Sequence, residues 1–179
     1  MNLFLIGYRG SGKTTVAAAL AKRLGWPWID ADVELERRAG KTIKQIFADA
    51  GEQAFRDLET AILAELARGD QQIVACGGGI VLRADNRAVL SQSGRCVWLR
   101  ASPESLLQRI ERDTTTAARR PNLTGQGGLG EIRTLLAERT PLYEACADVW
   151  VDAEARSPAE IAEQIIAELA LVAKQPLKD

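Results

Sequence analysis

The sequence predicts an α/β fold: a three-layer α/β/α sandwich in which helices cover both faces of a parallel sheet. Short apolar runs alternate with longer segments of helical periodicity along the whole chain. Clusters of Gly and Asp directly follow several of the apolar runs, at the points where strands would end. Because ligands bind beyond the carboxyl ends of such strands, these clusters are the first candidates for a functional site.

The first half of the chain supplies three strands and the helices between them. Strands are expected at residues 2–6, 28–30 and 72–76, and helices at 14–24 and 33–69. In the first helix, Val16, Leu20 and Leu24 recur at helical spacing. We expect Gly40 and Gly51 to break the second helical stretch into three pieces.

The second half continues the alternation. Strands are expected at residues 95–100 and 149–151, and helices at 84–93, from 103 onward, at 131–147, and from 158 to about 173. Residues 114–130 have no apolar periodicity, and a loop of that length in a compact domain is usually either functional or disordered. With no repeat and no linker, the 179 residues predict a single domain.

Composition excludes several classes of function. The formal net charge is −1, which gives no overall attraction to nucleic acid or to an anionic membrane. No apolar run approaches the roughly 20 residues that cross a bilayer. The first residues lack a basic leader and run into a glycine loop, so we expect no signal peptide and a cytoplasmic location. We also expect a monomer.

Cysteine and histidine usage narrows the chemistry. Cys76, Cys96 and Cys146 are widely spaced and lack metal-ligand spacing, so we expect reduced, structural thiols. The chain contains no histidine. Any proton transfer must therefore fall to carboxylates, to water or to the substrate itself.

The most specific motif is Gly7-Tyr8-Arg9-Gly10-Ser11-Gly12-Lys13-Thr14, which fits G-x-x-x-x-G-K-[ST] between a predicted strand and a predicted helix. Its glycines allow backbone N–H groups to surround phosphate oxygens, and the helix N-terminus adds a favourable dipole. We expect Lys13 to reach the β- and γ-phosphates of ATP, and the Thr14 hydroxyl to bind Mg²⁺.

Two acids follow the second strand. At a strand end, Asp30 and Asp32 can both face one cleft, one near Mg²⁺ and one near a substrate hydroxyl. The alternative is that Asp32 only caps the helix that follows.

Basic residues and a triple glycine follow later in the chain. Arg56 and Glu59 are three residues apart on a predicted helix, where a paired guanidinium can bind a substrate carboxylate; a surface ion pair is the alternative. Gly77-Gly78-Gly79 offers bare backbone to a ligand, or forms only a flexible turn. In the long loop, Arg119 or Arg120 can close over the phosphates, or belong to a solvated basic loop. Arg139 is a second carboxylate clamp or a helix-end charge.

Taken in order, these segments resemble the shikimate kinase family. The resemblance extends over nearly the whole chain, and it rests on Gly7 to Thr15, Asp30-Ala31-Asp32, Phe55-Arg56-Asp57-Leu58-Glu59, Gly77-Gly78-Gly79-Ile80-Val81, Arg120-Pro121 and Arg139-Thr140-Pro141-Leu142-Tyr143. It implies the P-loop kinase fold, with strand order 2-3-1-4-5 in a five-stranded parallel sheet. It also implies a helical substrate region at about 33–61 and a lid at about 113–127, in which Asn122 departs from the usual sequence.

The resemblance further implies the reaction: Mg²⁺-dependent transfer of phosphate from ATP to the 3-hydroxyl of shikimate. The implied catalytic residues are Lys13, Asp32 and Arg120. ATP would contact Gly10, Ser11, Gly12, Lys13, Thr14, Thr15, Arg112, Arg120 and Arg156. Shikimate would contact Asp32, Arg56, Gly78 and Arg139, and Thr14 and Asp30 would hold the metal.

Two rival hypotheses remain at the level of sequence. One is a kinase for another small acid, such as gluconate, or for a nucleoside monophosphate, although no base-reading pocket is evident. The other is a sensor that binds ATP or an acidic metabolite and catalyses nothing. The presence of Lys13, Asp30, Asp32, Arg56 and Arg139 favours an enzyme.

Overall fold

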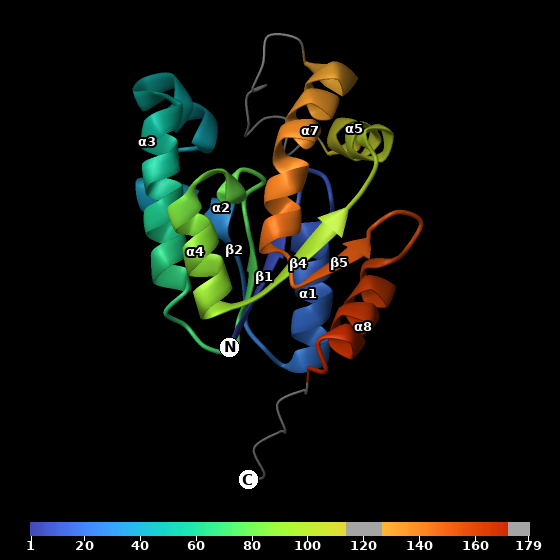
Figure 1. Cartoon of the computed structure of the whole chain (residues 1–179). Coiled ribbons are helices and arrows are strands. Elements are labelled where there is room, and N and C mark those ends of the chain that lie inside the picture. The colour runs from blue at the N-terminus through green and yellow to red at the C-terminus, as the bar shows by residue number, and fades with distance from the viewer. Residues whose placement is uncertain (114–126, 172–179) are drawn as a thin grey trace.

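The strands form one parallel sheet in the order β2-β3-β1-β4-β5 (Figure 1). The computed structural model describes residues 1–113 and 127–171. The strands are β1 (Asn2–Ile6), β2 (Trp28–Asp30), β3 (Ile73–Ala75), β4 (Gly94–Arg100) and β5 (Val149–Asp152). The predicted strand order and the three-layer architecture are confirmed.

Helices cover both faces of the sheet. They are α1 (Lys13–Leu24), α2 (Ala31–Ala39), α3 (Ile43–Leu66), the short 3₁₀ helix η1 (Ile80–Leu82), α4 (Ala84–Ser93), α5 (Pro103–Arg112), α7 (Gly128–Cys146) and α8 (Pro158–Glu168). Helices α1 and α8 pack on one face, and α3, α4 and α7 pack on the other (Figure 1). None of these helices, in the part of the chain that is described, is long and apolar enough to cross a membrane.

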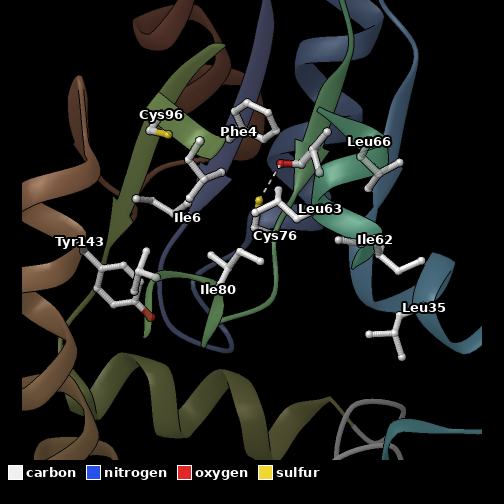
Figure 2. Packing of buried hydrophobic residues seen from close by; sticks show 14 of the residues in the cluster. Phe4, Ile6, Leu35, Ile62, Leu63, Leu66, Cys76, Ile80, Cys96 and Tyr143 are labelled. Carbon is white, nitrogen blue, oxygen red and sulfur yellow. Dashed lines mark hydrogen bonds between the residues drawn. The ribbon is translucent and has the colours of Figure 1, made fainter. Parts of the chain in front are cut away.

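The central strand β1 divides the core into two halves. Its alternate side chains point to opposite faces, so Leu3 and Leu5 pack against α1 and α8, whereas Phe4 and Ile6 pack beneath α3 and α4. Figure 2 shows the part of the core beneath α3 and α4, in which Tyr143 of α7 lies in the same cluster as Phe4 and Ile6. A strand buried on both faces reads as one continuous apolar run, which is why β1 is so evident in the sequence.

Most predicted boundaries agree with the structure to within a few residues. Gly40 ends α2, and Gly51 interrupts α3 with non-helical dihedral angles, as predicted. Helix α7 begins at Gly128, three residues before the expected start, and η1 was not predicted. The prediction that the last helix continues to about residue 173 is wrong for residues 169–171: the helix ends at Glu168, and Ala170 has a φ of 49°.

Candidate active site

The loop between β1 and α1 is shaped to surround phosphate groups. Gly10 and Gly12 have φ angles of 82° and 93°, in the left-handed region that only glycine enters without strain. Gly12 is the N-cap of α1, so the loop ends directly at a helix N-terminus, where backbone N–H groups and the helix dipole favour anions. The Lys13 ammonium donates to the carbonyl oxygens of Gly7 and Tyr8, at 2.8 Å each, which holds the lysine against the same loop.

The two predicted metal ligands lie in contact. The Thr14 hydroxyl donates to the Asp30 carboxylate over 2.7 Å, which brings the start of α1 next to the end of β2. The other oxygen of Asp30 accepts from the backbone N–H groups of Asp32 and Val33, so Asp30 is the N-cap of α2. The alternative that Asp32 caps this helix is therefore wrong. Hydroxyl and carboxylate oxygens are ligands that suit Mg²⁺, so this pair fits the metal.

Thr14 and Asp30 line a groove together with other residues that were predicted to bind ATP. It is lined by Gly10, Ser11, Gly12, Lys13, Thr14, Thr15, Asp30, Asp32, Arg109, Ala153 and Arg156, among others. Arg109 donates to the backbone oxygens of Gly10 and Ala153, which joins α5 to the phosphate loop and to the segment after β5. Arg112 is exposed at the end of α5 and does not line this groove in the part of the chain that is described.

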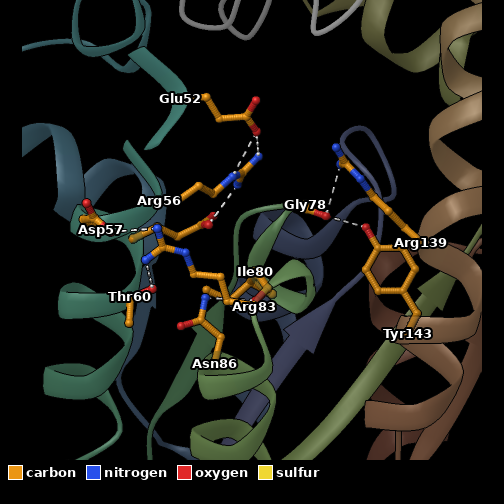
Figure 3. Close-up of polar contacts among 11 residues, drawn as sticks. Glu52, Arg56, Asp57, Thr60, Gly78, Ile80, Arg83, Asn86, Arg139 and Tyr143 are labelled. Atoms are coloured by element: carbon orange, nitrogen blue, oxygen red, sulfur yellow. Dashed lines mark hydrogen bonds and ion pairs between the residues drawn. The ribbon is translucent and has the colours of Figure 1, made fainter. Parts of the chain in front are cut away.

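A second hollow lies between α3 and α7, beside the glycines that follow β3. Its lining includes Arg56 of α3, Gly78 and Gly79, and Arg139 of α7. Tyr8, Phe47, Phe55, Ile110, Glu131 and Ile132 complete most of its wall. Figure 3 shows that the Arg56 and Arg139 side chains approach this space from opposite sides, with Gly78 between them. Two guanidinium groups in one partly apolar pocket suit a small carboxylate-bearing molecule.

Arg56 is a buried ion-pair residue. Its Nη1 lies 2.9 Å from a carboxylate oxygen of Glu59, and the two side chains are 9% and 5% exposed, which excludes the alternative of a surface ion pair. Burial acts to lower the pKa of Arg56, but the carboxylates of Glu59 and Glu52 outweigh it, and the pKa is raised. The guanidinium therefore stays charged at any pH at which the protein is folded.

Arg139 is held by backbone and aromatic contacts. Its Nη1 donates to the Gly78 carbonyl oxygen over 3.4 Å, and its guanidinium lies 5.7 Å from the centre of the Tyr8 ring. The Tyr143 hydroxyl donates to the same carbonyl oxygen of Gly78 (Figure 3). The buried Nε of Arg139 has no hydrogen-bond partner among the described residues, and an anion in the pocket could satisfy that donor.

The two hollows form one continuous site, because Arg9, Ile43 and Gly78 line both. A phosphate loop with its lysine, an adjoining hydroxyl–carboxylate pair and a neighbouring pocket with two arginines define a P-loop kinase that acts on a small anionic acceptor.

Comparison with known proteins identifies the family. A family model described as shikimate kinase matches residues 9–170. The chain is 45% identical to a shikimate kinase of Rhodopirellula baltica, over 92% of this chain and 88% of that protein. It is 43% identical to one from Symbiobacterium thermophilum, over 94% and 96% of the two chains. A solved shikimate kinase from Acinetobacter baumannii, in complex with shikimate, superposes with a TM-score of 0.89 at 37% identity, covering 94% of this chain and 92% of that one. The chain belongs to the shikimate kinase family and is an ATP-dependent kinase that uses Mg²⁺.

The structure brings most of the described candidate residues together around the two hollows, and it adds others that the sequence did not suggest. Arg56, Gly78 and Arg139 line the hollow between α3 and α7, whereas Asp32 lines the adjoining groove beside the phosphate loop. The predicted Arg119 and Arg120, with residues 114–126 of the expected lid, lie outside the described residues.

The missed residues include Arg9, Glu52, Arg109 and Glu131. Arg9 could have been identified from its place inside the phosphate-loop motif. Glu52 could have been identified from its spacing of four residues before Arg56. No local pattern identifies Arg109 or Glu131, because their helices enter the site only through tertiary packing.

Proposed function

We propose that the described residues divide the shikimate kinase reaction between a phosphate groove and an acceptor pocket. The reaction is transfer of the terminal phosphate of ATP to the 3-hydroxyl of shikimate, which gives 3-phosphoshikimate and ADP in aromatic amino acid biosynthesis. One observation carries the assignment of residues: two arginines from different helices face each other across Gly78, in a pocket that opens onto the phosphate loop.

The groove would hold the donor. The backbone N–H groups of residues 10–15 and the Lys13 ammonium would bind the phosphates of ATP. Thr14 and Asp30 would hold Mg²⁺, which supplies charge neutralisation at the phosphate oxygens when it is bound. Their hydrogen bond supports this role, because it places two hard oxygen ligands together next to the loop.

The pocket would hold the acceptor. Arg56 and Arg139 would bind the carboxylate of shikimate, and the backbone at Gly78 would form the wall between them. Asp32 would orient the attacking hydroxyl and accept its proton. Its position in the groove beside Lys13 and Asp30 supports this role, because the hydroxyl must meet the terminal phosphate there.

The remaining assignments rest on the family resemblance. Arg120 would stabilise the transferred phosphate from the lid, at about residues 113–127, while Arg112 and Arg156 would flank the adenine. Arg156 lines the groove, which supports its assignment. Helices α2 and α3 would form the substrate region at about residues 33–61, and residues 1–179 would be one kinase domain.

We also propose a cytoplasmic monomer. Cys76, Cys96 and Cys146 are free thiols, which suits a reducing compartment. ATP, the donor substrate, is available there as well.

The test is a coupled ADP-release assay with shikimate, gluconate, a nucleoside monophosphate or no acceptor. We expect rapid ADP release with shikimate alone. Turnover of gluconate or of a nucleotide without turnover of shikimate would overturn the proposal, and ATP binding with no acceptor-dependent turnover would favour a sensor. In the same assay, Asp32→Asn should abolish turnover, and Arg56→Ala should mainly raise the KM for shikimate.

A further inference from the structure

We propose that Glu52 is a positioning residue for the acceptor: it aligns Arg56 for the substrate carboxylate without touching the substrate itself. This inference rests on the proposed function of the acceptor pocket. Glu52 lies on α3, one turn before Arg56, and its side chain is 58% exposed. The residues that line the acceptor pocket do not include it.

Two acids, Glu52 and Glu59, accept hydrogen bonds from the guanidinium group of Arg56. One Glu52 carboxylate oxygen, Oε1, accepts from Nε over 3.2 Å and from Nη2 over 3.0 Å. On the other flank, Glu59 accepts from Nη1 over 2.9 Å. Figure 3 shows these two acids on either side of the guanidinium.

A guanidinium has five N–H donors, and these contacts use three of them. One N–H on Nη1 and one on Nη2 remain for a ligand. A neighbouring pair of N–H groups is the geometry that binds a carboxylate with two parallel hydrogen bonds. Among the described residues, the two acids therefore leave one donor on each terminal nitrogen, and Arg56 lines the pocket that is proposed to receive the acceptor.

The interruption of α3 explains how Glu52 reaches this position. Gly51 has a φ of 80° and a ψ of 177°, so the helix restarts at Glu52. A Cβ at Gly51 would meet no atom within 4 Å, so the glycine is required by backbone conformation rather than by close packing.

The backbone at Gly79 also packs against the guanidinium. A Cβ built at Gly79 would lie 2.2 Å from Nη1 of Arg56, so the guanidinium packs directly against this glycine. With Glu52, Glu59 and Gly79 in place, rotation of the guanidinium about its last bonds is restricted before the acceptor arrives. A group that is ordered in advance loses less entropy on binding, which strengthens the bound state.

Glu52 also carries a negative charge near the incoming carboxylate, and repulsion is the competing effect. Because its side chain is largely exposed, water and salt screen that charge at the distance of the acceptor. Its hydrogen bonds to Nε and Nη2 act at contact distance. We therefore expect alignment to outweigh repulsion.

The test compares Glu52→Ala with Glu52→Gln, which keeps an acceptor oxygen but loses the charge. Glu52→Ala should raise the KM for shikimate about three- to fivefold, the range of an ion pair with one buried partner. Its kcat and its KM for ATP should stay within about twofold of wild type. Glu52→Gln should restore most of the lost affinity. The matched control is Asp57→Ala, which removes an exposed acid of the same helix that pairs with Arg83 instead.

A double-mutant cycle with Arg56→Ala shows whether Glu52 acts through Arg56. If it does, adding Glu52→Ala to Arg56→Ala should change kcat/KM by less than about 1.5-fold. An equal effect in both backgrounds, or a KM that is unchanged or lowered in both Glu52 variants, overturns the inference. Wild-type protein is assayed alongside: if it does not phosphorylate shikimate, the proposed function fails. Normal wild-type turnover with unresponsive Glu52 variants refutes only the role of Glu52.

Discussion

The Thr14 hydroxyl donates a 2.7 Å hydrogen bond to the Asp30 carboxylate, and this contact links the phosphate loop to the start of α2. The same carboxylate accepts from the backbone N–H groups of Asp32 and Val33. Asp30 thus has two separable tasks: one oxygen caps a helix, and the other faces the predicted metal site. A substitution that preserves one task and not the other can separate stability from catalysis.

Asp30→Asn is that substitution. Asparagine caps helices about as well as aspartate, so thermal unfolding should shift little. The loss of charge should raise the Mg²⁺ concentration needed for half-maximal activity by about 10- to 100-fold, because a neutral amide holds Mg²⁺ less well than a carboxylate. A magnesium titration of the ADP-release rate measures this. Asp30→Ala is the comparison, because it should also lose about 1 kcal/mol of stability with the cap. Unchanged magnesium dependence in Asp30→Asn would remove Asp30 from the metal site.

Lys13→Ala should lower kcat by about 10²- to 10³-fold, the usual effect of removing one electrostatic contact to a reacting group. Its ammonium also bonds to Gly7 and Tyr8, so circular dichroism and thermal unfolding are needed to show that the variant is folded. Lys22, in the last turn of the same helix, provides a control substitution that should leave kcat unchanged. Activity of Lys13→Ala within tenfold of wild type would contradict the proposed role.

The phosphate loop and the sheet could be predicted because their signals are local. The run from Gly7 to Thr14 encodes its own conformation. Strand β1 is buried on both faces, so its residues from Leu3 to Ile6 form an unbroken apolar run. The kink at Gly51 was also predictable, because a glycine inside a helical pattern marks a break.

The acceptor pocket was harder to predict because it is assembled from distant segments. Arg56 and Arg139 are far apart in sequence, and only the parallel topology brings α3 and α7 to either side of Gly78. The Arg109 contact to Gly10 spans 99 residues and leaves no periodic trace. The last helix was overestimated because an apolar pattern continues past Glu168, although the backbone turns left-handed at Ala170.

Gly79→Ala should impair acceptor binding by displacing Arg56. Gly79 has φ −100° and ψ 4°, which alanine can adopt, so the backbone is not strained. The new methyl group would overlap the end of the Arg56 side chain, which must move away. We expect the KM for shikimate to rise at least about tenfold, and displacement of Arg56 from its buried pair with Glu59 should also lower the unfolding free energy.

Gly40→Ala is the control for that variant. Gly40 has a φ of 64° and open space around its Cβ position, so alanine there should cost about 1 kcal/mol of stability and leave the KM unchanged. Steady-state kinetics should therefore separate the two variants, because the KM for shikimate rises only in Gly79→Ala, and thermal unfolding shows that both are folded. An unaltered KM in Gly79→Ala would mean that the position of Arg56 is not critical for acceptor binding.

Cys96 should make the protein less stable at high pH. Burial, with smaller contributions from Cys146 and Asp148, raises the pKa of the Cys96 thiol from 9.0 to about 12. Below about pH 9 the thiol is protonated in both the folded and the unfolded chain, so its contribution to stability is fully present. Between about pH 9 and 12 the unfolded chain ionises first, so the free energy of unfolding falls by at most about 1.4 kcal/mol per pH unit from this group. Chemical denaturation at pH 8 and pH 10.5, compared between wild type and Cys96→Ala, isolates this contribution from other titrating groups. The wild type should lose more stability than the variant between these two pH values, and equal losses would show that the thiol pKa is not raised in the folded protein.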